Sequence, residues 1–221
     1  MDHIVKIIST HNVTHNVKQF NVEKPEGFIF TPGQATDLSI NEPGWKGKKN
    51  PFTFTGLADD DHLQFTIKIY QDSEEGVTRH LNELDKGHEL IISDAWGAIE
   101  YKGPGYFIAG GAGITPFIAI FRELYRTGKT ASNTLFFSNL TNRDIILQHE
   151  LETMLNGRCI FTTTRETGPG DHRKIDEAFL KNEVTDFSKH FYVCGPDAMV
   201  ADITKILENL GAKADSVVFE K

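Results

Sequence analysis

Short runs of alternating apolar and polar residues, many of them β-branched, dominate the first hundred positions. The runs lie at residues 5–9, 17–22 and 63–69, with turn-forming clusters at 24–27, 31–33 and 42–44 between them. Several short strands separated by proline and glycine are typical of a β-sandwich or barrel. One helical pattern, at residues 77–84, interrupts this half of the chain.

The pattern changes after the break at Lys102-Gly103-Pro104-Gly105. Continuous apolar runs now alternate with longer segments of helical periodicity. Strands are predicted at residues 106–109, 134–137, 158–163, 190–194 and 216–219, and helices at 115–125, 148–155, 175–181 and 198–210. Such alternation indicates βαβ units and a mostly parallel sheet. We therefore expect two domains, residues 1–102 and residues 103–221, that meet near Gly103.

Composition excludes several classes of function. The 221 residues carry a formal net charge of −8, whereas a nucleic-acid-binding protein needs a basic face for phosphates. The two cysteines, Cys159 and Cys194, are too few for a disulfide framework or an iron–sulfur cluster. The histidines lack metal-ligand spacing, so no metal site is expected. Because no signal peptide or membrane-spanning run is found, we expect a cytoplasmic protein with neither nucleic acid nor a membrane as partner.

A glycine-rich turn, GGAGITP at residues 110–116, joins the first strand of the second half to its helix. Thr115 is expected as the N-cap, and Pro116 suits the first helical position. Glycines let the backbone approach a ligand closely, and a helix start offers free N–H groups to an anion. We therefore predict that this turn binds a dinucleotide pyrophosphate. The spacing is not G-x-G-x-x-G, and a strand–helix turn without a ligand is the alternative.

A second segment, CGPDAM at residues 194–199, repeats this arrangement. An apolar strand ends at Gly195, and Pro196 opens the next helix. Ligands of open α/β sheets bind at the carboxyl ends of strands, so Cys194 should lie near the same edge as Gly111 if their strands are neighbours. The alternative is that Cys194 is a buried, unreactive side chain.

Five segments in order resemble the motifs of the ferredoxin–NADP reductase superfamily. They are FTPGQ at residues 30–34, NPFT at 50–53, GVTRHL at 76–81, the glycine-rich turn at 110–116 and CGPDAM at 194–199. The resemblance implies a β + α/β fold. An N-terminal antiparallel six-stranded flavin-binding β-barrel would be followed by a C-terminal parallel-sheet, Rossmann-like nucleotide-binding domain.

The resemblance also implies roles for individual residues. Phe52 would pack against the flavin of FAD, with Thr53 near its N5 atom, and Gly76, Val77 and Thr78 would contact the FAD pyrophosphate. The remaining residues implied to bind FAD or the nicotinamide nucleotide are Asn50, Pro51, Lys68, Ile69, Gly111, Gly113, Thr115, Pro116, Arg165, Gly195, Pro196, Asp197 and Met199. Thr53, Cys194 and Glu220 are expected to lie along the path of the hydride.

The chain departs from the family pattern at two places. Asn50 stands where the R-x-Y-S motif begins with arginine, so one cationic contact to FAD is absent. Many members end in a glutamate, one further residue and an aromatic that covers the flavin. Here Glu220 matches the glutamate, and the aromatic position lies beyond Lys221. The sequence therefore predicts an open flavin face, unless a partner chain or an aromatic such as Trp96 or Phe219 covers it.

The segment Thr164-Arg165-Glu166 resembles the family's S-R-E motif, which contacts the 2′-phosphate of NADP. Guanidinium groups suit phosphate, so NADP is expected, with NAD as the other possible nucleotide. Arg173 and Lys174 would add positive charge. The alternative for Arg165 is a surface ion pair.

The predicted function is transfer of electrons from NAD(P)H through FAD to an external acceptor such as ferredoxin or flavodoxin. Two alternatives remain open. The first is the reductase subunit of a multicomponent oxygenase system, and the second is a flavin-binding module without catalytic activity.

Overall fold

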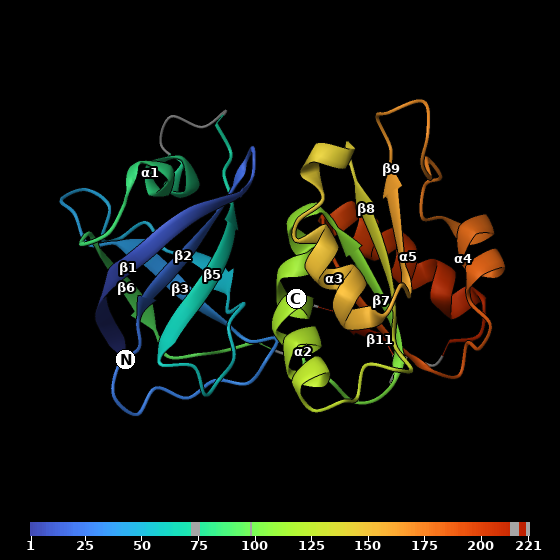
Figure 1. Cartoon of the computed structure of the whole chain (residues 1–221), viewed down its shortest axis with the longest axis horizontal. Coiled ribbons are helices and arrows are strands. Elements are labelled where there is room, and N and C mark those ends of the chain that lie inside the picture. Colours follow the sequence, from blue (N-terminus) through green and yellow to red (C-terminus); the bar gives the residue numbers. More distant parts are fainter. Residues whose placement is uncertain (72–75, 98, 213–216, 220–221) are drawn as a thin grey trace.

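The computed structural model describes residues 1–71, 76–97 and 99–212, and the backbone alone of 217–219. Figure 1 shows two halves side by side, a blue-to-green barrel and a green-to-red α/β unit. Within the described residues, one sheet has six strands and the other has five. The expected fold class, a β-barrel followed by a parallel-sheet domain, is confirmed.

The first sheet is antiparallel and follows the order β4-β3-β6-β1-β2-β5. Its strands are β1 (Asp2–Thr14), β2 (Val17–Glu23), β3 (Ala35–Ile40), β4 (Asn50–Thr53), β5 (His62–Lys68) and β6 (Glu89–Ser93). A bridge between Phe54 and Phe65 joins the region after β4 to β5, which closes the sheet into a barrel. Inward-facing apolar side chains fill it, and the short helix α1 (Val77–Glu83) packs against the same core through Val77 and Leu81.

The second sheet is parallel and follows the order β11-β10-β7-β8-β9. Its strands are β7 (Gly105–Gly110), β8 (Thr134–Asn139), β9 (Cys159–Thr163), β10 (His190–Cys194) and β11 (Val217–Phe219). The helices are α2 (Thr115–Arg126), α3 (Gln148–Leu155), α4 (Glu177–Glu183) and α5 (Asp197–Asn209), with 3₁₀ turns η1 (Gly111–Ile114) and η2 (Asn142–Asp144). Helices α2 and α3 cover the face toward the barrel, and α4 and α5 cover the other (Figure 1).

Two details differ from the sequence prediction. Thr115 is not the N-cap of α2, because η1 runs directly into the helix and places Ile114 at that position. The Thr115 hydroxyl instead donates to the carbonyl oxygen of Ala112 at 3.0 Å. Strands β3 and β4 were not predicted as separate elements. The chain passes between the sheets from Ser93 to Gly105, and the division at residues 102 and 103 stays a prediction.

The two halves share apolar contacts. Val17 of β2 and Ile99 of the connecting segment are each 2% exposed and belong to the core cluster under α2 and α3. None of the helices within the described ranges has the length and apolar character needed to span a membrane.

Candidate functional site

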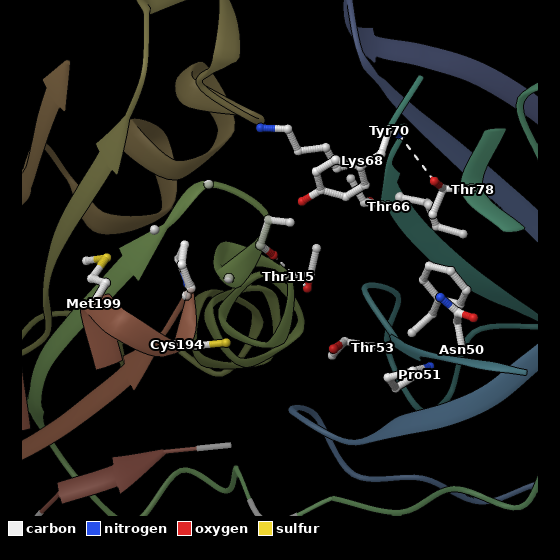
Figure 2. A pocket seen from close by; sticks show the side chains of 18 of the residues that line it. Asn50, Pro51, Thr53, Thr66, Lys68, Tyr70, Thr78, Thr115, Cys194 and Met199 are labelled. Carbon is white, nitrogen blue, oxygen red and sulfur yellow. Dashed lines mark hydrogen bonds between the residues drawn. The ribbon is translucent and has the colours of Figure 1, made fainter. Parts of the chain in front are cut away.

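A cavity of about 890 Å³ lies where the barrel meets the carboxyl edge of the parallel sheet (Figure 2). Its volume falls in the usual range of ligand pockets, about 300–1,000 Å³. Both halves of the chain contribute to its wall. The barrel supplies Asn50, Pro51, Phe52, Thr53, Thr66, Ile67, Lys68, Tyr70, Gly76, Val77, Thr78 and Trp96, and the α/β half supplies Gly110, Gly111, Ala112, Gly113, Thr115, Ser138, Asn139, Leu140, Thr164, Cys194, Gly195, Pro196 and Met199.

The barrel wall is built on β4 and β5. Thr53 ends β4 opposite Ala35 of β3 and is 9% exposed. Phe52 packs partly against the barrel core. Thr66 of β5 is buried, and its hydroxyl lies 3.0 Å from the hydroxyl of Thr55 in a hydrogen bond. The pairing of β4 with β3 and of β5 with β2 fixes the position of polar groups along one side of the cavity.

The N-terminal end of α1 forms the upper part of the same wall. The Thr78 hydroxyl accepts a hydrogen bond from the Tyr70 backbone N–H at 3.2 Å, which ties the helix to the end of β5 (Figure 2). At the other end of α1, the ammonium of the buried Lys18 donates to the carbonyl oxygens of Asn82 and Leu84 at 3.0 and 2.8 Å. A cation at a helix C-terminus is favourable, so Lys18 holds α1 in place.

The glycine turn after β7 packs directly on the turn after β10. A Cβ atom added to Gly113 would lie 2.3 Å from the carbonyl oxygen of Cys194, and one added to Gly110 would lie 2.5 Å from the sulfur of Met199. Gly111 has a φ of +52°, a conformation that side-chain-bearing residues rarely adopt. The glycines are thus required by packing between the turns as well as by access to the cavity.

Thr53 and Cys194 lie on opposite walls, with the cavity between them (Figure 2). Cys194 ends β10 and is 7% exposed. Higher in the cavity, Lys68 extends from β5 toward the α/β half, and its Nζ atom would be 3.9 Å from a Cβ atom at Gly111. Side chains from the two halves therefore meet across the cavity.

The described part of the cavity wall has little charge although the chain is acidic. Among the described residues of its wall, Lys68 is the one with a charged side chain, and no carboxylate is present. Asp144, which is not among the lining residues, has a lowered pKa: burial would raise it, but hydrogen bonds from the Thr141 hydroxyl and N–H, together with the charges of Lys68 and His15, outweigh burial. A cation, glycine-turn amides and several hydroxyls are suited to an anionic, hydroxyl-bearing ligand.

Most of the residues singled out from the sequence line this cavity, but four of those that the structure describes do not. The Ile69 side chain is buried in the barrel core, Pro116 is buried in α2, and Asp197 and Arg165 are exposed outside the cavity wall. Glu220 lies outside the described residues.

The basic residues expected to bind a 2′-phosphate differ in their surroundings from the prediction. Arg173 pairs with Asp171 and Glu183 at 2.6 and 2.7 Å, so its charge is already compensated. The Arg165 side chain makes no hydrogen bond or ion pair with the part of the chain that the structure describes, while its neighbour Thr164 lines the cavity. The alternative for Arg165, a surface ion pair, is therefore not seen among these residues.

Trp96, named from the sequence as a possible cover of the flavin, is a half-exposed aromatic at the cavity. Other lining residues were not predicted. Tyr70 is a second half-exposed aromatic there, and Ser138, Asn139 and Leu140 lie at the end of β8. Tyr70 could have been suspected from its position next to a predicted strand. The segment SNLTN after β8 has no sequence signal beyond that of an ordinary polar turn.

The chain matches two family models. Residues 3–132 match an FAD-binding domain, and residues 107–205 match an oxidoreductase NAD-binding domain. The first of these covers more than half of the chain.

Individual proteins are more distant. The chain is 25% identical to the reductase component of propane 2-monooxygenase from Rhodococcus jostii, over 90% of this chain and 57% of that protein. It is 31% identical to NADH–cytochrome b5 reductase 1 of Arabidopsis thaliana, over 66% of this chain and 55% of that protein. The chain thus spans little more than half the length of these two relatives. A ferredoxin NADP⁺ reductase from Neisseria gonorrhoeae, crystallised with FAD and NADP, has the same fold, with a TM-score of 0.85 at 20% identity over 99% of this chain and 98% of that one.

Proposed function

The chain belongs to the ferredoxin–NADP reductase superfamily, with an FAD-binding domain followed by an oxidoreductase NAD-binding domain, and on this premise we propose that it is an NAD(P)H-dependent flavoprotein reductase. In this proposal it takes a hydride from the nicotinamide nucleotide and passes electrons to an external acceptor. An electron-carrier protein such as ferredoxin or flavodoxin is the acceptor we favour.

One observation carries the proposal. A single cavity is lined on one side by Asn50, Pro51, Phe52 and Thr53 of the barrel and on the other by the glycine turn and Cys194. Two cofactor sites that open into one space are what direct hydride transfer needs, because the reacting atoms must come within about 3–3.5 Å. A module that only carries flavin has no need of the second wall.

The wall residues fit the two cofactors. Lys68 lines the cavity and the described lining residues include no carboxylate, which suits the phosphates of FAD and of the nucleotide. Bound FAD would supply the redox chemistry, namely the acceptance of a hydride and the release of single electrons. Phe52 provides an apolar surface for the flavin ring, and the Thr53 hydroxyl is a hydrogen-bond partner at the ring edge. Gly113 and Cys194 provide the opposing surface for nicotinamide.

Two further parts of the proposal concern which nucleotide is preferred and which acceptor is reduced. Thr164 and Arg165 support NADPH, because the guanidinium has no compensating carboxylate among the described residues. A second candidate function, the reductase component of an oxygenase system, is favoured by the similarity to the propane 2-monooxygenase component. The two candidates differ in whether one fixed partner or several acceptors are reduced.

The central test is anaerobic stopped-flow reduction of the flavin-loaded protein by NADH and by NADPH. We expect extraction to release FAD and either nucleotide to bleach its visible absorption. Thr53→Val should slow reduction at least about tenfold, as loss of a positioned hydrogen-bond partner does in other sites. Thr36→Val is the matched control, because Thr36 is a fully buried threonine of neighbouring β3 outside the cavity wall. A protein that binds FAD but is reduced by neither nucleotide would disprove the proposal.

A further inference from the structure

Asn139 has an unusual position in the cavity wall. Among the described residues that line the cavity, it alone holds buried side-chain polar atoms without a hydrogen-bond partner, and this applies to both Nδ2 and Oδ1. The residue is 4% exposed. Its backbone is engaged, since its carbonyl oxygen accepts from the Thr164 N–H at 3.0 Å. Unpaired buried amides oppose folding and are rare in native structures, so a missing partner is the simplest explanation.

The sheet register places Asn139 at the carboxyl edge of the sheet, beside the glycine turn. It is the last residue of β8, paired with Thr163 of β9, and the preceding Ser138 is paired with Gly110 of the glycine turn. Cys194 ends β10, on the opposite side of β7. A dinucleotide with its nicotinamide between Cys194 and Thr53 and its pyrophosphate at the glycine turn would therefore direct its adenosine half across β8.

The chemistry of the side chain narrows the partner. Oδ1 can only accept a hydrogen bond, and Nδ2 can only donate. A pyrophosphate has no proton to give at neutral pH, so it would leave Oδ1 unpaired. A ribose hydroxyl both donates and accepts. We propose that the amide of Asn139 binds the hydroxyls of the adenosine ribose of the nicotinamide nucleotide. This inference rests on the proposed function, since it requires a dinucleotide in this cavity.

The test compares two ligands with two variants of the FAD-loaded protein by isothermal titration calorimetry. The ligands are ADP and 2′,3′-dideoxy-ADP, which lacks both ribose hydroxyls. The variants are Asn139→Leu, which keeps the side-chain volume, and Thr162→Val as the control. Thr162 is also fully buried with an unpaired hydroxyl, but it lies in β9 outside the cavity wall.

We expect the wild-type protein to bind ADP about tenfold to a hundredfold more tightly than dideoxy-ADP, and Asn139→Leu to bind both equally weakly. Thr162→Val should retain the wild-type difference. The melting temperature of the ligand-free Asn139→Leu protein should not fall, because an unpaired amide is removed; a merely structural asparagine would give a lower one.

Equal wild-type affinity for ADP and dideoxy-ADP overturns the inference without reference to any variant. So does an Asn139→Leu protein that still discriminates between the two ligands. Either result leaves the proposed function intact as long as NAD(P)H reduces the flavin. If the wild-type protein neither binds ADP nor is reduced, the proposed function itself fails.

Discussion

Arg122 joins the two halves of the molecule, and replacing it by alanine should lower the free energy of unfolding by about 3 kcal/mol. From α2, its Nη1 atom donates to the carbonyl oxygen of Thr55 at 2.7 Å and to Oε1 of Gln64 at 2.5 Å, both in the barrel. Nε and Nη2 donate to the two carboxylate oxygens of Glu150 in α3 at 2.6 and 3.0 Å. The Arg122 side chain is 19% exposed.

The magnitude follows from the two bonds to the barrel. Hydrogen bonds from a charged donor contribute about 1.5–3 kcal/mol each, and the lower value applies because Gln64 keeps a second bond, to the Thr55 hydroxyl at 3.2 Å. Two such bonds give about 3 kcal/mol. Glu150 is 34% exposed, so water can replace its lost partner and the ion pair adds little.

The assay is urea unfolding followed by tryptophan fluorescence and by far-ultraviolet circular dichroism. Both tryptophans, Trp45 and Trp96, precede β7, so fluorescence reports on the barrel, while dichroism reports mainly on the helices of the α/β half. In the wild-type protein the two transitions should coincide. In Arg122→Ala both midpoints should fall, and the transitions should separate because the halves are less strongly coupled.

Arg126 supplies the matched control. It lies one turn further along α2 and also reaches the barrel, where it pairs with Asp59, but the two side chains are 46% and 62% exposed. Exposed pairs contribute about 0–1 kcal/mol. If Arg126→Ala destabilises the protein as much as Arg122→Ala, or if the latter costs less than about 1 kcal/mol, burial is not the reason for the strength of the Arg122 contact.

Four further predictions concern single side chains. Gly113→Ala should abolish reduction by NAD(P)H while FAD stays bound, because the new methyl group would overlap the Cys194 carbonyl; retained reduction would show that the turn can move. Lys18→Met should weaken FAD retention on a desalting column by loosening α1, and an unchanged flavin content would argue against this. Arg165→Ala should raise the KM for NADPH much more than that for NADH, and equal effects would contradict the assignment to the 2′-phosphate. Burial raises the pKa of the Cys159 thiol to about 12, so the reactive thiolate is scarce at pH 8 and iodoacetamide should leave Cys159 unmodified in native protein but not in urea, as peptide mass mapping would show.

Sequence reasoning was most accurate where strands are buried on both faces. The strand at residues 190–194 and the helix at residues 148–155 agree with β10 and α3 at both ends. Parallel strands covered by helices read as continuous apolar runs. One atypical residue does not hide such a run. In the barrel, strand β3 reads ATDLSI, and its three polar residues break the apolar pattern that would have predicted a strand. Its hydrogen bonds to β4 and β6 stabilise it, and they cannot be read from the segment itself.

The candidate site shows the same division between local and non-local information. Motifs identified the turns that line the cavity, since a glycine turn is a local property. They did not show that the Ile69 side chain turns into the barrel core or that Arg173 is paired with two carboxylates. Asn139 could not be found from the sequence, because nothing in SNLTN indicates that the amide is buried without a partner. Only the packing of the surrounding chain shows this.

The core contact of Val17 and Ile99 limits how such a chain can be recombined. Both side chains lie in the first hundred residues, yet they pack in the apolar cluster of the α/β half. A chimaera that joins the barrel of one relative to the α/β half of another at residues 102 and 103 must also match this contact in volume. A mismatch would leave a cavity or an overlap, each of which costs about 1–3 kcal/mol. Exchange between relatives should therefore succeed most often when β2 and α2 come from the same parent.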